Sequence, residues 1–280
     1  MINFFISFIM MAISFCNAFS VTTNHIEKFC LMNAGSFIDE FYRKTPARSN
    51  ILYSMSFIQY PNDIKSHQVF IQKNYDSHII SSSLDVLNFG VLEDIDENTF
   101  SASDKKFELS IFNIESQSFI YGVSTGYVFS NIDSYSSTIV TYNIGFKKYL
   151  LQQRLSIGFS IENINKVIAD YSNINESYIS SKKITTELIP QYLKALIVFD
   201  YIHTDNSPSE YALGIKKYIN KNINIFLGKY FFIDNKNEVM LFDNCAAGID
   251  FSIKDYKINF GVQHLSSSII SFGTSLSVIK

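Results

Sequence analysis

The sequence predicts an all-β protein, a transmembrane antiparallel β-barrel of about fourteen strands. After residue 50, apolar and polar residues alternate through successive strand-length segments, and the segment 155–161 reads Leu-Ser-Ile-Gly-Phe-Ser-Ile. A period of two residues places one set of side chains on each face of a sheet. The polar set is mostly Ser, Gly, Asn and Thr, with few of the Lys and Glu residues that coat a soluble surface. A closed barrel with an apolar outer face and a polar interior accounts for both observations.

Thirteen segments carry the strand pattern, and many of them have the length of about ten residues that a tilted spanning strand needs. A further strand or short helix before Ile51 would complete the even number of strands that bacterial barrels have. The stretches 91–106 and 165–191 are expected to be outer loops or segments that enter the lumen. The predicted strands are 51–60, 66–75, 78–90, 107–114, 119–130, 138–147, 155–164, 192–204, 209–219, 223–232, 245–253, 256–263 and 269–279.

Short turns and longer loops are expected to alternate along the chain. The pairs Asp76-Ser77 and Lys254-Asp255, and the triplet 220–222, place turn-forming residues between apolar runs, as hairpin connections do. Short turns on one side and longer loops on the other are typical of transmembrane barrels.

The N-terminus predicts a three-part organisation. Residues 1–18 resemble a secretory signal peptide, because an apolar core from Phe4 to Phe15 precedes the small-residue ending Cys16-Asn17-Ala18. An uncleaved anchor and lipidation at Cys16 are the alternatives. Residues 19–50 form an N-terminal segment or lumen plug, and residues 51–280 form the barrel. Cleavage after Ala18 would deliver the chain to the outer membrane of a Gram-negative bacterium, with membrane lipid as its surroundings.

Composition limits the remaining classes of function. The net charge of −3 and the pI near 6.0 argue against a nucleic-acid partner, which usually requires a basic surface. No apolar run after the signal reaches the ~20 residues of a spanning helix. Cys30 and Cys245 would remain after cleavage, either as a disulfide in an oxidising periplasm or as two buried thiols.

Catalytic chemistry has little support in the sequence. The stretch Gly122-Val123-Ser124-Thr125-Gly126 matches the nucleophile elbow of hydrolases, with His203 and Asp205 as conceivable partners. That elbow requires a sharp turn from a strand into a helix, whereas this match falls inside a predicted strand. The five histidines lack the spacing of a zinc site. We therefore predict no catalytic residue, no cofactor and no metal, and a hydrolase that uses Ser124 is the enzyme alternative.

Short stretches along most of the chain resemble the PorV/PorQ family of outer-membrane proteins, which is associated with type IX secretion and related to FadL-type barrels. The matching stretches are Asn33-Ala34-Gly35-Ser36, Thr45-Pro46-Ala47, Asn88-Phe89-Gly90, Phe100-Ser101-Ala102-Ser103-Asp104, Glu162-Asn163-Ile164 and Leu188-Ile189-Pro190. The family usually has Asn where this chain has Thr45.

The resemblance implies about fourteen strands, an N-terminal segment tucked into the lumen, and a non-enzymatic role in protein secretion or surface attachment. Partners would then be secretion-system proteins or exported clients. The first alternative is a FadL-like transporter of small hydrophobic molecules. The second is a soluble periplasmic β-sandwich that serves as a binding module, because such sheets also alternate.

Overall fold

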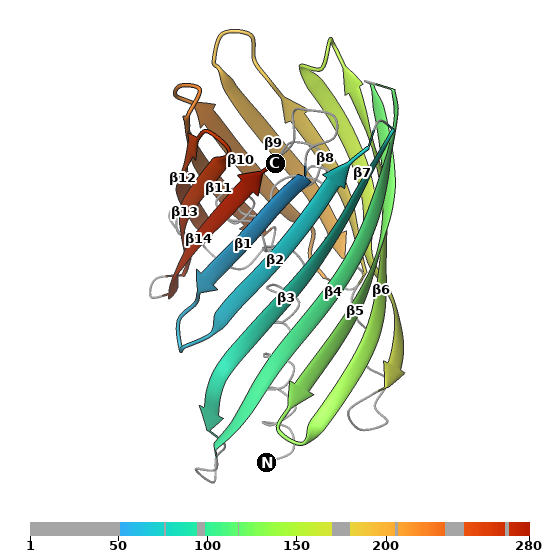
Figure 1. The fold of residues 1–280 in the computed structure, drawn as a ribbon, viewed down its shortest axis with the longest axis vertical. Helices are drawn as coiled ribbons and strands as arrows, with labels where there is room; N and C mark the ends of the chain where they lie inside the picture. Colours follow the sequence, from blue (N-terminus) through green and yellow to red (C-terminus); the bar gives the residue numbers. More distant parts are fainter. Residues whose placement is uncertain are drawn as a thin grey trace.

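Fourteen antiparallel strands form one closed barrel in the computed structural model (Figure 1). The structure describes residues 51–75, 77–93, 99–116, 118–169, 180–204, 207–232, 244–266 and 269–280. Each strand pairs with its neighbours in sequence, and β1 pairs with β14 to close the sheet. The strands are β1 (Ile51–Gln59), β2 (Lys65–Asn74), β3 (His78–Glu93), β4 (Thr99–Ser116), β5 (Phe119–Ile132), β6 (Tyr135–Leu150), β7 (Leu155–Ala169), β8 (Ser181–Leu188), β9 (Ala195–Thr204), β10 (Glu210–Tyr218), β11 (Ile223–Phe232), β12 (Cys245–Ile253), β13 (Tyr256–Ser266) and β14 (Ile269–Ile279).

The two ends of the barrel differ in their connections. At the end that we call the turn end, the connections are 75–77, 117–118, 151–154, 189–194, 219–222 and 254–255. The chain also enters β1 and leaves β14 there, since Ile51 and Lys280 exchange backbone hydrogen bonds of 2.8 and 2.9 Å. The opposite end, the loop end, has the longer connections 170–180 and 233–244. Short connections also occur at this end, at 60–64, 94–98, 133–134, 205–209 and 267–268. The predicted asymmetry between short turns and longer loops is therefore found only in those two long connections.

Local turn chemistry explains several hairpins. Asn62 and Asp63 both have positive φ, of 58° and 57°, and they reverse the chain between β1 and β2. Asp133 and Lys254 take the same left-handed conformation in the two-residue turns after β5 and β12. Asn and Asp tolerate this region better than other side chains, and primed hairpin turns require it.

The wall is longer on one side. Strands β3 to β7 have 14 to 18 residues, and they extend below β1, β2 and β14 in Figure 1. The pairing of β2 with β3 stops at Lys65 and Asn88, whereas β3 continues to pair with β4 as far as Glu93 and Thr99. The predicted loop 91–106 is thus wrong at both ends, because these residues continue the two strands.

The second predicted loop, 165–191, is also wrong in part. Strand β7 continues through 165–169, and 181–188 forms β8, which pairs with β7 and β9. This unpredicted strand is the fourteenth, because the segment expected before Ile51 lies outside the described residues. Charged residues on its inner face made 181–188 resemble a loop.

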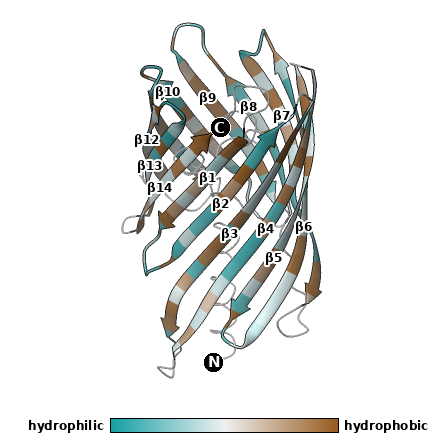
Figure 2. Cartoon of the chain, in the orientation of Figure 1, coloured by the Kyte–Doolittle hydropathy of each residue, from teal (hydrophilic) through white to brown (hydrophobic). Residues whose placement is uncertain are grey.

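Alternation places one set of side chains in the lumen and the other on the outer surface. Along β6, for example, Thr141, Asn143 and Lys147 are buried inside, while Ile144 and Phe146 are exposed outside. Figure 2 shows hydrophobic and hydrophilic residues following one another along the strands. A single closed sheet replaces the two sheets of a sandwich, so the sandwich alternative is wrong. No helix in the described part of the chain is long and apolar enough to cross a membrane.

Candidate functional site

The lumen is layered along the barrel axis, and β1 shows the layers in order. From the turn end, its inward residues are Leu52, Ser54, Ser56 and Ile58, all of them buried. Ser54 shares a hydrogen bond of 2.9 Å with Ser277 of β14. Apolar side chains therefore lie on both sides of a polar level.

Strands β3 and β4 repeat this order. The inward positions of β3 run from Ile79 through Ser81 and Asp85 to Leu87. On the antiparallel β4, the buried positions Ala102, Asp104, Ser110 and Phe112 follow the reverse order. We call the intervening level the polar belt; it includes Ser54, Ser56, Ser81, Asp85, Lys106, Glu108, Ser110 and Ser124.

Two apolar clusters border the polar belt. The turn-end cluster consists of Leu52, Phe70, Ile79, Phe112 and Ile120. The second, which we call the cross-lumen cluster, joins residues of β1, β3 and β4 to residues of β9, β10 and β11. Because these two groups of strands are not neighbours in the sheet, the cluster reaches across the lumen. Its buried members are Ile58, Tyr60, Leu87, Phe89, Ala102, Leu196, Val198, Ala212 and Phe226.

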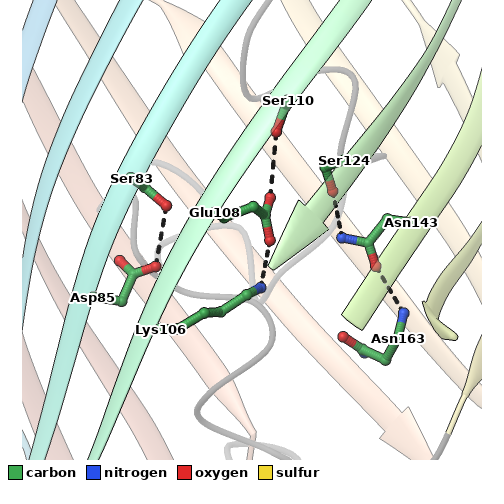
Figure 3. Close-up of polar contacts among 8 residues, drawn as sticks. All are labelled: Ser83, Asp85, Lys106, Glu108, Ser110, Ser124, Asn143 and Asn163. Atoms are coloured by element: carbon green, nitrogen blue, oxygen red, sulfur yellow. Dashed lines mark hydrogen bonds and ion pairs between the residues drawn. The ribbon is translucent and has the colours of Figure 1, made fainter. Parts of the chain in front are cut away.

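Short polar contacts organise the belt (Figure 3). Lys106 and Glu108 form an ion pair of 2.5 Å, and Ser110 donates a 3.5 Å hydrogen bond to the other oxygen of Glu108. On β3, Ser83 donates a hydrogen bond of 3.2 Å to Asp85. These partners lie two residues apart on one strand, which is the spacing of successive inward positions.

A second set of belt contacts connects three strands. Asn143 of β6 donates a hydrogen bond of 2.7 Å to Ser124 of β5, and its Oδ1 accepts one of 2.7 Å from the backbone N–H of Asn163 in β7. Asn163 has a φ of 59°, and the register of β6 and β7 shifts between Tyr142 and Ile144. Asn143 thus satisfies a backbone donor at a β-bulge, where the regular ladder is interrupted.

Ser124 is a buried structural residue of this network. The Gly-x-Ser-x-Gly match lies in the interior of β5, where no turn into a helix occurs. Close packing requires the two glycines of this match. A Cβ on Gly122 would lie 2.2 Å from Phe112, and one on Gly126 would lie 2.6 Å from Thr141. His203 lies on β9, and Asp205 lies outside the described residues.

Ion pairs occupy the lumen wall formed by β6 to β9. Lys147 Nζ lies 2.7 Å from Glu187, which also accepts a 2.9 Å hydrogen bond from Ser156. Lys183 Nζ lies 2.8 Å from Asp200. We call Lys147, Glu187, Lys183 and Asp200 the charged face. Their side chains are at most 6% exposed, so each charge depends on its partner for stabilisation.

The structure does not gather the residues singled out by the family resemblance into one site. Asn33, Gly35, Pro46 and Ala47 lie outside the described residues. Ser101 and Ser103 face outward on β4, whereas Ala102 belongs to the cross-lumen cluster and Asp104 accepts a hydrogen bond from Ser130. Asn163 forms the bulge opposite Asn143. Pro190 lies in the turn between β8 and β9, at the opposite end from Ser101.

The layers and the charged face were not predicted from the sequence. The pattern of β8 could have predicted the charged face, because Lys183 and Glu187 alternate with outward residues in the same way as the inward residue Thr185. Charged residues on the inward phase of a strand point to paired partners on neighbouring strands. Within the described residues, no group of three or more His, Cys, Asp or Glu residues could hold a metal ion.

Neither a protein-family model nor a curated protein sequence matches the chain. Solved structures do match its fold. The monoaromatic hydrocarbon channel CymD superposes with a TM-score of 0.68 at 9% identity, covering 93% of this chain and 97% of that one. The Ralstonia pickettii toluene transporter TbuX gives 0.61 at 8%, covering 91% and 96%. The Pseudomonas putida toluene transporter TodX gives 0.60 at 8%, covering 84% and 89%.

These likenesses confirm the predicted fold, a closed antiparallel barrel of the outer-membrane kind. At 8–9% identity they show the fold alone, and they do not show a relation to PorV/PorQ. These matched proteins are transporters and a channel.

Proposed function

We propose that the chain spans the outer membrane of a Gram-negative bacterium and conducts small hydrophobic molecules, such as monoaromatic hydrocarbons, across it. The observation that carries this proposal is the cross-lumen cluster. Water-filled barrels have polar interiors, whereas this lumen brings aliphatic and aromatic side chains from opposite walls together. Apolar surface of this kind binds an apolar solute and excludes hydrated ones.

The outer surface supports a position in the membrane. Strand β4 presents Phe107, Leu109 and Ile111 outward, and each of them is more than 40% exposed. On the same face, Lys105 follows toward the loop end and Asn113 toward the turn end. An outward apolar band with polar residues on both sides is the arrangement of a transmembrane barrel.

Expression of the full chain, with its own signal, in a Gram-negative host tests both parts of the proposal. A heat-dependent mobility shift in the outer-membrane fraction would identify a folded barrel in that membrane. Uptake of radiolabelled toluene at limiting concentration should exceed that of cells with an empty vector. In reconstituted liposomes, permeation by a small sugar should stay near the background. Efficient sugar permeation would contradict the proposal and indicate a water-filled pore.

A matched pair of variants on β3 tests the role of the cross-lumen cluster. Leu87 belongs to the cluster and Ser81 to the polar belt, and both are buried on the same inner face. Leu87→Asn should lower toluene uptake about tenfold, which corresponds to about 1.4 kcal/mol of lost binding. Ser81→Asn should have a much smaller effect. Equal losses in two folded variants would contradict a specific role for the cluster.

A second proposal is that the barrel serves protein secretion or surface attachment in the manner of PorV/PorQ proteins. Besides the sequence stretches given above, the one-sided extension of β3 to β7 at the loop end favours it. A wall that rises on one side offers a surface on which a client could dock. A benzophenone attached to the thiol of Ser101→Cys, which faces outward on the extension, should then capture an exported protein on irradiation. Crosslinking to lipid alone, with toluene uptake intact, would favour the first proposal.

A further inference from the structure

We propose that the turn end binds anionic phospholipid through a surface built on three neighbouring turns. These are 151–154 between β6 and β7, 189–194 between β8 and β9, and 219–222 between β10 and β11. We call this surface the turn platform. The proposal requires the barrel to span a membrane, as proposed above, but it does not depend on what passes through the lumen.

Hydrogen bonds fix the three hairpins relative to one another. The backbone N–H of Ile189 donates a bond of 2.7 Å to the carbonyl of Arg154, and the N–H of Tyr218 donates one of 3.0 Å to the carbonyl of Lys194. The side chain of Arg154 also donates a bond of 3.0 Å to Gln191. In Figure 1, the first two turns extend beyond the ends of β1 and β14 at the top of the view. The platform is therefore a connected and projecting part of the turn end.

Large apolar side chains are exposed on these turns. Tyr192 is 91% exposed, Leu151 69%, Leu193 53% and Ile219 51%. Side chains of this kind are costly to place in water as a contiguous group. At a membrane surface they enter the boundary between headgroups and acyl chains, where aromatic and aliphatic residues of barrels and interfacial helices are found.

Basic residues lie near the apolar ones, and their side chains point outward, toward the surrounding lipid. On β6, Lys148 follows Phe146 on the outward phase, and on β10, Lys217 follows Ile215. Each ammonium group thus lies just beyond the outward apolar band, at the level of lipid phosphates, and points away from the lumen. Cations at that level attract anionic headgroups.

Arg154 adds a guanidinium group in the first turn of the platform. This group is suited to bidentate contacts with phosphate oxygens. Lys217 donates one hydrogen bond, to the carbonyl of Leu193, and an ammonium group has three donors. It can therefore hold this turn and a phosphate at the same time.

The charges of the connections between strands are distributed in the same sense. By sequence, the connections at the turn end hold four basic residues and two acidic ones, Asp76 and Asp255, both outside the platform. The acidic residue Glu115 lies near the end of β4. The connections at the loop end hold eleven acidic residues and one basic residue, Lys236. The charges of the connections therefore favour an anionic headgroup at the turn end.

Lipid fits these observations better than an acidic partner protein does. Binding of a partner protein to the end of the barrel would require charged side chains that point along the barrel axis. Lys148 and Lys217 instead project sideways from the wall, into the layer that headgroups occupy. The exposed apolar residues of the turns extend the same interfacial zone.

Native mass spectrometry of the purified full chain in detergent micelles tests the proposal. The probes are phosphatidylglycerol, phosphatidylcholine and inorganic phosphate, each added separately. We expect phosphatidylglycerol to bind at least tenfold more tightly than phosphatidylcholine. The triple variant Lys148→Gln, Arg154→Gln and Lys217→Gln should abolish that preference. The control Lys65→Gln, Lys105→Gln and Lys166→Gln removes three exposed cations toward the loop end and should retain it.

Other results would overturn the proposal. Equal binding of the two lipids by the native chain would exclude a headgroup site. Equal loss in both triple variants would indicate a general charge effect, and binding of inorganic phosphate as tight as that of the lipid would indicate a simple anion site. Retained lipid preference in the platform variant, with loss of a co-purifying periplasmic protein, would assign the surface to a protein. A heat-dependent mobility shift verifies that each variant is folded, and toluene uptake tests the transport proposal separately.

Discussion

The charged face and the cross-lumen cluster occupy equivalent positions of the barrel, since both consist of inward residues buried in the lumen. They meet the demands of burial in different ways. Lys147 is stabilised by Glu187 across β7 at 2.7 Å, and Lys183 by Asp200 on the adjacent β9 at 2.8 Å. Val198 and Phe226, at 0% exposure, are packed against apolar residues of the opposite wall.

The difference shows how one alternating pattern can serve two purposes. An ion pair has directional requirements, so the charged face links β6, β8 and β9 in one relative register. Its net contribution to stability is small, because the attraction must offset a large desolvation penalty. The cross-lumen cluster has no directional requirement, and it gains free energy in proportion to the apolar area removed from water. The charged face therefore specifies the relative register of the strands in the wall. The cross-lumen cluster stabilises the wall and provides a surface for apolar solutes.

The largest effect is expected from Lys147→Met, which removes one partner of a buried pair. Glu187 would then retain Ser156 but lose its counter-ion. We expect the free energy of unfolding to fall by about 3–5 kcal/mol. Urea titration in detergent micelles measures the change from the shift of the midpoint at constant slope.

The double variant Lys147→Met with Glu187→Met provides the control. Replacing both charges with apolar residues of similar size should recover most of the loss, because buried pairs are often no more stable than apolar residues in the same place. A double variant as unstable as the single one would mean that stability on this face depends on the pair itself and not on a carboxylate that has lost Lys147.

Much of the fold could be predicted from the sequence, and β8 shows where that prediction failed. A strand was recognised readily where its inward residues are small, as with Gly122, Ser124 and Gly126 of β5. In β8 the inward residues are Lys183, Thr185 and Glu187, and charges on the buried phase made the segment resemble a solvated loop. Their counter-ions come from β6 and β9, so the reason for burying them is not present in the segment itself.

The candidate site was harder to predict than the fold, for a related reason. Alternation tells which residues face inward, but it does not tell which residues meet across the lumen. Leu87 and Phe226 are 139 positions apart in the sequence, and closure of the barrel places them in one cluster. The resemblance to PorV/PorQ rested on short stretches, and those within the described residues lie at both ends of the barrel.

An intermediate effect is expected from Gly122→Ala on β5. A Cβ there would lie 2.2 Å from Phe112 Cδ1 and 2.9 Å from the backbone oxygen of Ile111. Phe112 belongs to the tightly packed turn-end cluster, and such overpacking costs about 1–3 kcal/mol. Gly126→Ala, on the same strand, would instead meet Thr141 and the flexible end of Lys106. If the turn-end cluster is more rigid than the polar surroundings of Gly126, urea titration should show a larger loss in the free energy of unfolding for Gly122→Ala than for Gly126→Ala.

Phe112→Leu in the Gly122→Ala background tests the cause of that loss. The smaller side chain should relieve the clash and restore part of the stability. If the double variant is as unstable as Gly122→Ala alone, the clash with the backbone of Ile111 causes the loss of stability, and the packing of the turn-end cluster does not.

The smallest effect is expected from two separate substitutions between Val and Thr, whose side chains have nearly equal shapes. They test the difference between the charged face and the cross-lumen cluster most directly. Val198 lies in the cross-lumen cluster on β9, and Thr185 lies among the charged pairs on the adjacent strand β8. Val198→Thr buries a hydroxyl group among apolar neighbours, and we expect urea titration to show a loss of about 1–2 kcal/mol. Within the described residues, the buried Thr185 hydroxyl has no hydrogen-bonding side-chain or backbone partner. Thr185→Val should therefore leave stability unchanged or raise it slightly. A loss in Thr185→Val as large as that in Val198→Thr would show that the hydroxyl of Thr185 supports the surrounding ion pairs, and the charged face would then depend on a wider polar network than its four charged residues.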